Sequence, residues 1–260
     1  MNDPLEKLLS SKKYQSVCPD TVRRVWAECA QRHKKPKDAE RAAREALHGI
    51  TGAFLTPDES ARCLRDMRAW AEGGRSDELL ARALERHAST RERLPISRVD
   101  ALCARVASEI GRPERVLDLA CGLNPLYLGA RGIHARGVDI SGEAVRAINA
   151  CAADYGLPVS AACADLLCEG AIPAEYFDLA LLLKTLPLIE RQRRGAARDV
   201  MARVNARFLI ASFPTRTLGG RNVGMEAHYS AWMAENLPAN RRVAARFADE
   251  NELFYLLAEA

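Results

Sequence analysis

Five short apolar segments recur after residue 112, and each of them is followed by a turn or a helical stretch. The segments cover residues 115–119, 135–140, 159–165, 177–183 and 208–213, and helical patterns near 143–153 and 189–204 separate some of them. Helices cover both faces of a parallel sheet, so its strands read as continuous apolar runs. The second part of the chain is therefore predicted to be a doubly wound α/β fold.

Two more strand-like runs lie near the end of the sequence. Residues 243–248 and 252–258 are joined by Asp249-Glu250-Asn251, a short polar turn. Such a pair predicts an antiparallel terminal hairpin. Five parallel strands and a closing hairpin make a Rossmann-like sheet of seven strands, and this layout resembles the class I methyltransferases that use S-adenosylmethionine (SAM).

The first 95 residues show helical patterns and no β-patterned run. One helix is expected to be capped by Asp20-Thr21 and to bury a stripe at helical spacing, namely Val22, Val25, Trp26 and Cys29. Further helices are expected over 36–49, 57–73 and 76–87. A chain of 260 residues has room for one large domain and a smaller companion. We expect a small all-α domain over 1–95 and a SAM-binding domain over 96–260.

Charge is distributed unevenly between these two parts. Residues 1–95 carry 19 Lys and Arg against 15 Asp and Glu, whereas residues 96–260 carry 19 of each. The densest stretch, 12–37, holds eight basic and two acidic residues. A basic module beside a neutral one predicts that the first docks on a polyanion while the second does the chemistry. A solvated helical face is the alternative interpretation.

Other sequence features exclude several protein classes. No stretch approaches the roughly 18 consecutive apolar residues of a membrane span, and the first residues lack the apolar core of a signal peptide. The eight cysteines include no Cys-x-x-Cys pair and no tight Cys/His cluster. Reduced thiols of a cytoplasmic protein fit this pattern better than disulfides or a structural zinc site. We therefore expect no membrane association and no metal.

Three of the predicted strands end at an acidic residue. Asp118 opens the turn DLACGLNP (118–125), Asp139 ends the second strand and Asp165 ends the third. Open α/β sheets bind ligands at the carboxyl ends of their strands, where a carboxylate can accept both hydroxyl groups of a ribose. Asp165 with Leu166 is placed to meet an adenine edge. Taken singly, each Asp also fits a helix cap or a turn.

A nicotinamide dinucleotide is the rival ligand for such a layout. It normally requires a Gly-x-Gly-x-x-Gly turn around its pyrophosphate. Only Gly122 remains of that pattern, and Leu123-Asn124-Pro125 follows it. SAM has no phosphate, so the turn favours SAM.

Six blocks of the sequence resemble one known family in the right order. They are SKKY (11–14) with CPDTVRR (18–24), LHG (47–49), HASTRERL (87–94), DLACGLNPL (118–126), LKTLPLIERQ (183–192), and SFPTR (212–216) through LGGR (218–221) to MEA (225–227). The family is that of the aminoglycoside-resistance 16S rRNA methyltransferases, which modify N7 of guanine 1405 in the decoding site. The resemblance extends over nearly the whole chain.

This resemblance implies a set of cofactor-binding residues. His87, Ala88 and Ser89 would line the methionine end of SAM, and the guanidinium fork of Arg93 suits its carboxylate. The remaining candidates are Ala120 and Gly122 under the cofactor, Asp139 at the ribose, Asp165 with Leu166 at the adenine, and Leu183, Gln192 and Phe54 completing the pocket. Phe54 also fits a place in the helical core. Without the resemblance, residues 86–93 read only as a charged connection.

The resemblance also implies the reaction. A methyl group would pass from SAM to rRNA in the assembled 30S subunit, leaving S-adenosyl-L-homocysteine and conferring resistance to 4,6-disubstituted deoxystreptamine drugs. N7 of guanine carries a lone pair and no proton, so the attack needs no general base and catalysis relies on positioning. We therefore name no acid–base residue. The target lies in a paired rRNA helix, so its base is expected to flip out.

Basic residues are the candidates for contact with RNA. Those expected to dock on rRNA phosphates are Lys12, Lys13, Arg23, Arg24, Lys34, Lys35 and Lys37. Lys184, the only lysine after residue 37, stands at a strand end and is expected to contact the flipped nucleotide or its phosphate. A lysine that snorkels out of the strand is the alternative. Arg216 and Arg221 flank a loop after the fifth strand and are expected to contact phosphate or the target base.

Two other functions remain open at this point. A class I methyltransferase acting on a small molecule would use the helical region only as a lid, which the uneven charge disfavours. A catalytically dead RNA-binding protein with a degenerate SAM fold would explain the single-glycine turn. We expect a monomer whose partner is the 30S subunit with its 16S rRNA.

Overall fold

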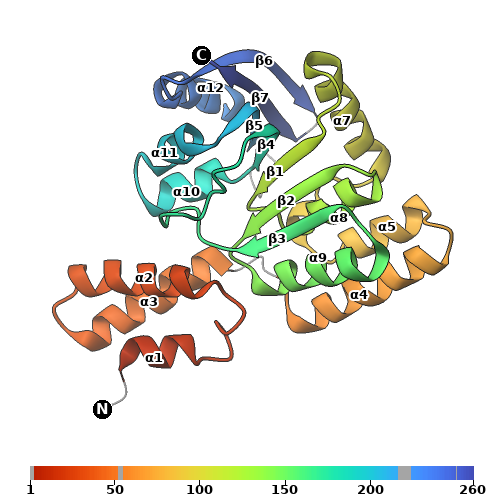
Figure 1. Ribbon diagram of the computed structural model, residues 1–260. Helices are drawn as coiled ribbons and strands as arrows, with labels where there is room; N and C mark the ends of the chain where they lie inside the picture. The colour runs from red at the N-terminus through yellow and green to blue at the C-terminus, as the bar shows by residue number, and fades with distance from the viewer. Residues whose placement is uncertain (1–2, 52–54, 216–223, 250) are drawn as a thin grey trace.

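The computed structural model describes residues 3–51, 55–215, 224–249 and 251–260. Its strands are β1 (Arg115–Leu119), β2 (His134–Asp139), β3 (Val159–Cys163), β4 (Phe177–Leu183), β5 (Ala206–Pro214), β6 (Arg241–Asp249) and β7 (Glu252–Glu259). They form one sheet of order β3-β2-β1-β4-β5-β7-β6 (Figure 1). Neighbours among β1 to β5 run parallel, and β7 runs antiparallel to β5 and β6. The predicted seven-stranded sheet with an antiparallel terminal hairpin is confirmed.

Helices precede the sheet and cover both of its faces (Figure 1). Those before the sheet are α1 (Pro4–Leu9), α2 (Pro19–Arg32), α3 (Pro36–Thr51), α4 (Pro57–Glu72), α5 (Asp77–Leu84), α6 (Ala88–Arg91) and α7 (Ile96–Ile110). Those between and after its strands are α8 (Asn124–Ala130), α9 (Gly142–Tyr155), α10 (Leu186–Gln192), α11 (Ala196–Arg203) and α12 (Met225–Asn236). In the described residues, no helix is long and apolar enough to cross a membrane.

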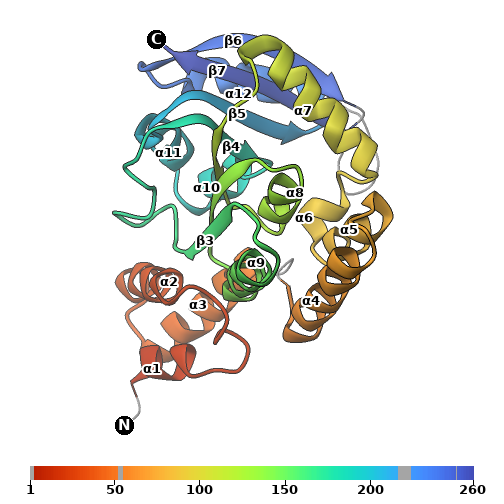
Figure 2. The ribbon, with the colours of Figure 1, turned by 45° about the vertical axis from the view of Figure 1, so that its right-hand side comes forward.

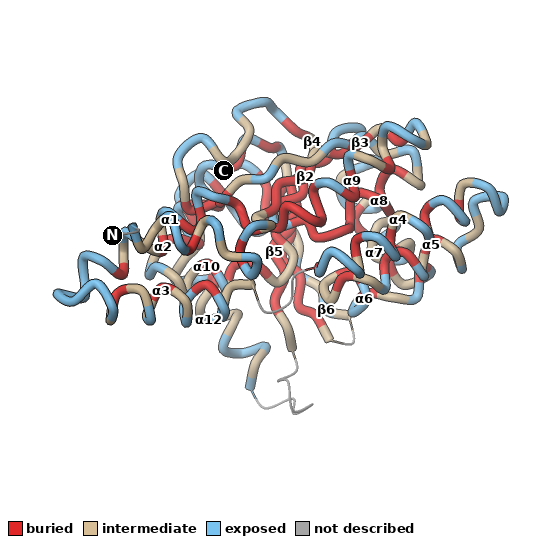
Figure 3. The backbone as a smooth tube through the Cα atoms, turned by 90° about the horizontal axis from the view of Figure 1, so that it is seen from below, coloured by how far each residue is buried: buried red, intermediate tan, exposed pale blue. Residues whose placement is uncertain are grey.

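The side chains of the central strands alternate between two apolar clusters. Val116 and Leu181 belong to the cluster shared with α7, α8 and α9. Leu117 and Leu182 belong to the cluster shared with α10, α11 and α12. Successive strand residues point to opposite faces, and both faces are covered, so the central strands lie in the most buried part of the molecule (Figure 3). This double cover explains the apolar runs in the sequence.

The helices of the first 95 residues pack in two groups (Figure 2). Helices α1, α2 and α3, here called the N-terminal module, enclose their own apolar cluster, which contains Leu8, Val22 and Leu47. Helices α4 and α5 share the cluster of the sheet through Trp70 and Leu80, and α4 packs on α9. The domain boundary at residue 95 stays a prediction. The apolar core that is separate from the core of the sheet belongs to the N-terminal module.

Backbone hydrogen bonds fasten the N-terminal module to the sheet. The amide of Cys18 donates to the carbonyl oxygen of Ile140 at 2.8 Å, and the amide of Gly142 donates to that of Ser16 at 2.6 Å. Between them, Val17 and Ser141 form an isolated antiparallel bridge. Residues 140–142 directly follow β2, so the module is attached at the carboxyl ends of the strands.

Three predicted helix boundaries are wrong. Cys18, not Asp20-Thr21, caps α2, because Pro19 already occupies its first turn. Helix α3 continues through Gly49 to Thr51. The single helix expected over 189–204 is divided into α10 and α11 by Gly195, whose φ of 82° no α-helix contains.

Helices α1, α6, α7, α8 and α12 are absent from the sequence-based prediction, and α8 and α12 could not be found from periodicity. Helix α8 is buried on almost all sides, and the buried residue of α12 is Met233. An amphipathic helix is recognised by an apolar stripe on one face. Neither helix has such a stripe, so periodicity could not reveal them.

Candidate functional site

The carboxylate of Asp139 connects the ends of β1 and β2. One of its oxygens accepts a hydrogen bond from the amide of Gly122 at 2.8 Å, and the other accepts one from the amide of Ser141 at 2.8 Å. Asp139 is buried. A carboxylate offers about four acceptor positions, so each oxygen keeps capacity for a further donor such as a ribose hydroxyl group.

The turn after β1 requires glycine at position 122. Gly122 has a φ of +54°, and a Cβ atom there would lie 2.6 Å from Oγ of Ser89 and 2.8 Å from Nδ1 of His87. The segment around α6 therefore lies directly on this turn. Ala120, two residues earlier, also has a positive φ of 58° and is exposed at the strand end. Residues far apart in the sequence are thus brought together around one turn.

His87 is held as a neutral imidazole beside this turn. Its Nδ1 lies 2.8 Å from Oγ of Ser89 and accepts a hydrogen bond from the amide of Ser89 at 3.3 Å. Burial lowers the pKa of His87, against the opposing effect of Asp139. Thr90 anchors the segment by donating to the carbonyl oxygens of Leu84 and His87.

Arg93 is a buried guanidinium with unused hydrogen-bonding capacity. Its Nη1 donates to the carbonyl oxygen of Ser89 at 2.8 Å, and its Nη2 lies 3.5 Å from a carboxylate oxygen of Glu252. Its Nε is buried and has no hydrogen-bond partner among the described residues. An unsatisfied buried donor costs about 1–3 kcal/mol. An anionic ligand group at this position would remove that cost.

Asp118 lies behind the turn and is buried. Nδ2 of Asn124 donates to its carboxylate at 2.6 Å. Burial raises the pKa of Asp118 to about 7, while Asn124 and Arg93 oppose this shift. The strand-end carboxylates at 118 and 139 thus differ in environment, because Asp139 accepts two backbone amides and Asp118 accepts one side-chain amide.

Asp165, two residues after the end of β3 and not at the predicted strand end, binds a residue of the N-terminal module. Its Oδ1 accepts the amide of Leu167 at 2.9 Å, and its Oδ2 lies 3.0 Å from Nε and 2.9 Å from Nη2 of Arg24. Nη2 of Arg24 also donates to Oε1 of Gln192 at 2.8 Å. Asp165 and Gln192, both predicted at the cofactor, are therefore linked by a side chain of α2.

Lys184 stands at the end of β4 with a φ of +56°. Its Nζ lies 2.8 Å from a carboxylate oxygen of Glu92 and 3.6 Å from one of Glu252. Ser212 donates to Glu252 and so helps to orient it. Arg93 and Lys184 thus share the buried carboxylate of Glu252, which stands at the start of β7.

The comparison with protein families decides the identity of this fold and site. Residues 10–255 match the family described as ribosomal RNA methyltransferase (FmrO). The chain belongs to the FmrO family. The family expected from the sequence blocks is thereby confirmed, and the sheet order is that of its predicted class I methyltransferase fold.

Individual FmrO-family relatives are similar over almost their whole length. A curated protein of Serratia marcescens named 16S rRNA (guanine(1405)-N(7))-methyltransferase is 43% identical over 258 residues, which cover 99% of this chain and 98% of the relative. The crystal structure of the 16S rRNA methyltransferase RmtF in complex with S-adenosyl-L-homocysteine has a TM-score of 0.88 and 48% identity, covering 99% of this chain and 97% of that one. The structure of the 16S rRNA methylase RmtB has a TM-score of 0.83 and 39% identity, covering 100% and 98%.

Five of the cofactor-binding residues predicted from the FmrO-family resemblance lie together around the turn at Gly122. His87, Ser89, Arg93, Gly122 and Asp139 are in mutual contact or one residue apart in the network above, and Ala88 begins α6. Leu183 is half-buried at the end of β4. The side chain of Leu166 instead belongs to the apolar cluster under α10 and α11, so its contact with adenine stays a prediction. Phe54 lies outside the described residues.

The predicted rRNA contacts of this FmrO-family chain divide into four groups. Lys12, Lys13, Arg23, Lys34, Lys35 and Lys37 are exposed on the N-terminal module. The side chain of Arg24 is 11% exposed and its guanidinium is engaged by Asp165 and Gln192, and its RNA contact stays a prediction. Lys184 faces two carboxylates, and its RNA contact stays a prediction. Arg216 and Arg221 lie outside the described residues.

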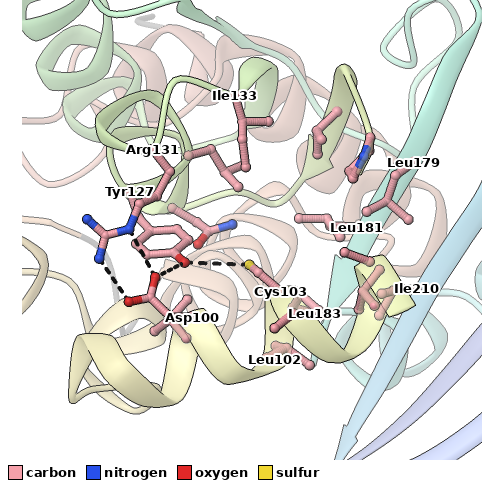
Figure 4. Close-up of a pocket in the computed structure, with 18 of the residues that line it drawn as sticks. Asp100, Leu102, Cys103, Tyr127, Arg131, Ile133, Leu179, Leu181, Leu183 and Ile210 are labelled. Atoms are coloured by element: carbon pink, nitrogen blue, oxygen red, sulfur yellow. Dashed lines mark hydrogen bonds and ion pairs between the residues drawn. The ribbon is translucent and has the colours of Figure 1, made fainter. Parts of the chain in front are cut away.

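An apolar cavity lies between α7 and the sheet (Figure 4). It encloses about 330 Å³ and is lined mainly by apolar side chains such as Val99, Cys103, Leu181 and Ile210. At one side, Asp100 accepts hydrogen bonds from Tyr127 at 2.7 Å and from Arg131 at 2.9 Å. Arg93 and Leu183, which are predicted at the cofactor, and Asn124 are also among its lining residues.

Two participants in the site are missing from the sequence-based set. Glu252, which pairs with Arg93, Lys184 and Ser212, reads in the sequence only as the first residue of a strand. Asn124, which binds Asp118, reads as part of a turn. A buried Glu at the start of a strand indicates a functional site, but the sequence does not reveal that this Glu is buried. In the part of the chain that the structure describes, no group of three or more His, Cys, Asp or Glu is arranged to hold a metal ion.

Proposed function

We propose that this protein methylates N7 of guanine 1405 in 16S rRNA, using SAM, and thereby protects ribosomes from 4,6-disubstituted deoxystreptamine aminoglycosides. The observation that carries this proposal is the near full-length similarity to the Serratia marcescens 16S rRNA (guanine(1405)-N(7))-methyltransferase. The RmtF structure with S-adenosyl-L-homocysteine supports the same cofactor and product. The comparisons give no support to a small-molecule substrate.

The residues around the turn at Gly122 fit SAM. Arg93 offers its unpartnered Nε and its guanidinium edge to the methionine carboxylate, and a bidentate pair of this kind is a strong charge-assisted contact. Asp139 keeps one acceptor position on each oxygen for the ribose hydroxyl groups. The exposed Ala120 leaves the strand end open for the cofactor to lie across it. Asp165, with Leu166, Leu183 and Gln192, is assigned to the adenosine end.

When bound, SAM supplies an electrophilic methyl group on its sulfonium. The acceptor N7 has a free lone pair and no proton, so the protein has no proton to remove there. Its task is to hold the two reactants in line and close together, which by itself lowers a barrier substantially. His87, whose pKa is lowered by burial, and the segment 87–93 are assigned to placing the methionine end.

The N-terminal module is assigned to docking on rRNA. Its exposed basic residues Lys34, Lys35 and Lys37 lie around the α2–α3 connection, and Lys12 and Lys13 follow α1. Phosphate contacts of this kind position a protein on RNA without reading sequence. On this proposal the protein acts as a monomer on the 30S subunit in the cytoplasm.

Methyl transfer from labelled SAM to purified 30S subunits tests the proposal. The product is mapped by borohydride and aniline treatment, which cleaves RNA at N7-methylguanine. One new cleavage at guanine 1405 is expected, with 50S subunits as the control substrate. Label without cleavage would move the methyl group to another atom, and absence of label with SAM still bound would overturn the rRNA substrate.

A further inference from the structure

Two cysteine thiols meet where the N-terminal module joins the sheet. Cys18 caps α2, and its amide is held by Ile140 at 2.8 Å. Cys163 is the last residue of β3. Sγ of Cys18 lies 3.8 Å from the carbonyl oxygen of Cys163, and Sγ of Cys163 lies 3.9 Å from the carbonyl oxygen of Ile140. The backbone bonds around Val17 and Ser141 maintain this contact between residues 145 positions apart.

The two thiols have complementary exposure. Cys18 is 1% exposed, whereas Cys163 is open to solvent. A small reagent can therefore reach Cys163, and the buried thiol of Cys18 lies against this residue. This arrangement, an accessible thiol with a resolving thiol beside it, is typical of pairs that close to a disulfide.

The surroundings of Cys18 favour its thiolate. The Cys163 thiol and the amides of Thr21 and Asp20, at the start of the 14-residue helix α2, lower the pKa of Cys18 to about 6, against the effects of burial and the Asp20 carboxylate. Helix N-termini stabilise thiolates in this way. By contrast, burial raises the pKa of the Cys121, Cys63 and Cys151 thiols. The neighbouring Cys18 and burial raise the pKa of Cys163, with a further contribution from Asp139 and an opposing one from Arg146.

We propose that Cys18 and Cys163 are a redox-active dithiol that closes to a disulfide between α2 and β3 when a small disulfide such as oxidised glutathione reaches Cys163. The sulfur of Cys163 attacks one glutathione sulfur while its proton passes to the Cys18 thiolate. The glutathione S–S bond breaks, and one glutathione leaves. Cys18 then releases its proton and attacks the sulfur of Cys163, so the mixed disulfide breaks and the second glutathione leaves.

This step balances. The two cysteines lose two electrons, and the glutathione disulfide gains them to form two thiols. One of the protons on these thiols comes from the cysteine pair and one from water. The product joins the N-terminal module covalently to the sheet, two residues before Asp165. The proposal does not depend on the RNA substrate, since it is read from the thiols themselves.

The test uses the reduced full-length protein incubated with oxidised glutathione at neutral pH. We expect two of the eight thiols to disappear, and peptide mapping to recover a Cys18–Cys163 disulfide. In Cys18→Ser, the mixed disulfide with glutathione on Cys163 is expected to persist. In Cys163→Ser, no cross-link forms. Cys168→Ser is the matched control, because Cys168 is half-buried nearby and outside the pair, and it should behave as the wild type.

Three outcomes would overturn the proposal. They are a persistent glutathione adduct on Cys163 in the wild type, a disulfide to any other cysteine, or no loss of thiols. Circular dichroism of each variant checks that it folds. Should a serine variant unfold, the wild type alone still decides, because time-resolved mapping must find the Cys163 adduct before the Cys18–Cys163 disulfide. Methylation of 30S subunits by the reduced protein tests the proposed function separately.

Discussion

The guanidinium of Arg24 and the carboxylate of Asp165 form a nearly buried ion pair across the junction of the N-terminal module and the sheet. Nε lies 3.0 Å and Nη2 2.9 Å from the same oxygen of Asp165, and the two side chains are 11% and 6% exposed. Nη1 of Arg24 also pairs with Glu28 at 3.2 Å. The module that is proposed to dock on rRNA therefore positions a carboxylate at the proposed adenosine end of the site.

Replacing Arg24 by Ala should weaken SAM binding about tenfold, on the order of 1.4 kcal/mol. The reason is that Asp165 and Gln192 lose the side chain that orients them, and a buried carboxylate loses its partner. Isothermal titration calorimetry with SAM measures the effect. Arg23→Ala is the matched control, because Arg23 is the neighbouring residue and its ion pair with Asp20 is exposed. Equal changes in both variants would contradict the positioning role.

Replacing Asp139 by Asn should raise the dissociation constant for SAM about 10- to 100-fold, which is roughly 1.4–2.7 kcal/mol. Asparagine turns one acceptor oxygen toward Gly122 or Ser141 into a donor, so it disturbs the turn as well as the ribose contact. Asp178 offers a matched control, since its carboxylate accepts the amides of Glu114 and Arg115 at the start of β1. Asp178→Asn should lower stability and leave SAM affinity intact. A similar loss of SAM affinity in both variants would contradict the assignment of Asp139 to the ribose.

Asp118 should make stability depend on pH. Burial raises its pKa to about 7 in the folded protein, against about 3.9 when unfolded. The folded state therefore holds a proton that the unfolded state releases, so this contribution is complete below about pH 4 and lost as pH rises to about 7. The full contribution is on the order of 4 kcal/mol.

Urea unfolding of the wild type and of Asp118→Asn checks this sign. Asparagine cannot ionise, so the unfolding free energy of the variant should rise relative to that of the wild type between about pH 4 and about pH 7. Both proteins retain His87 and every other titratable group, which removes their contributions from the comparison. A difference in unfolding free energy that does not change with pH would show that Asp118 is ionised throughout.

Charge reversal at Lys34 and Lys35 should weaken binding to the 30S subunit and leave SAM affinity unchanged. Both residues are exposed on the N-terminal module. If each contacts a phosphate, the slope of log affinity against log salt should decrease by about two. Binding is measured by filter assay over a range of salt concentrations. The matched control reverses Arg65 and Arg82, which are exposed on α4 and α5. An equal loss in the control would place the docking surface elsewhere.

Several local features of the protein follow from residues that are close together in sequence. The apolar run 177–183 could be assigned to a strand because both faces of β4 are covered. Pro57 and Gly73 mark the ends of α4 in the sequence and in the structure. The motif around Gly122 indicates its turn, because a glycine after a buried strand permits the positive φ observed there.

Features that join distant segments could not be predicted in this way. Arg24 stands in a basic stretch and reads as a phosphate ligand, but the packing of α2 brings it to Asp165, 141 residues away. The apolar stripe of α4 predicts that one face is buried, and only the structure shows that this face packs on the cluster of the sheet.

The sequence by itself determined the strands, the acidic strand ends and, through its motif blocks, the family. These depend on periodicity and on short motifs, which are local properties of the chain. Only the tertiary structure decided that Arg24 is an internal partner, that Glu252 balances Arg93 and Lys184, and that Cys18 meets Cys163. The physical reason is that burial and pairing of a charged or thiol side chain depend on which distant segment packs against it.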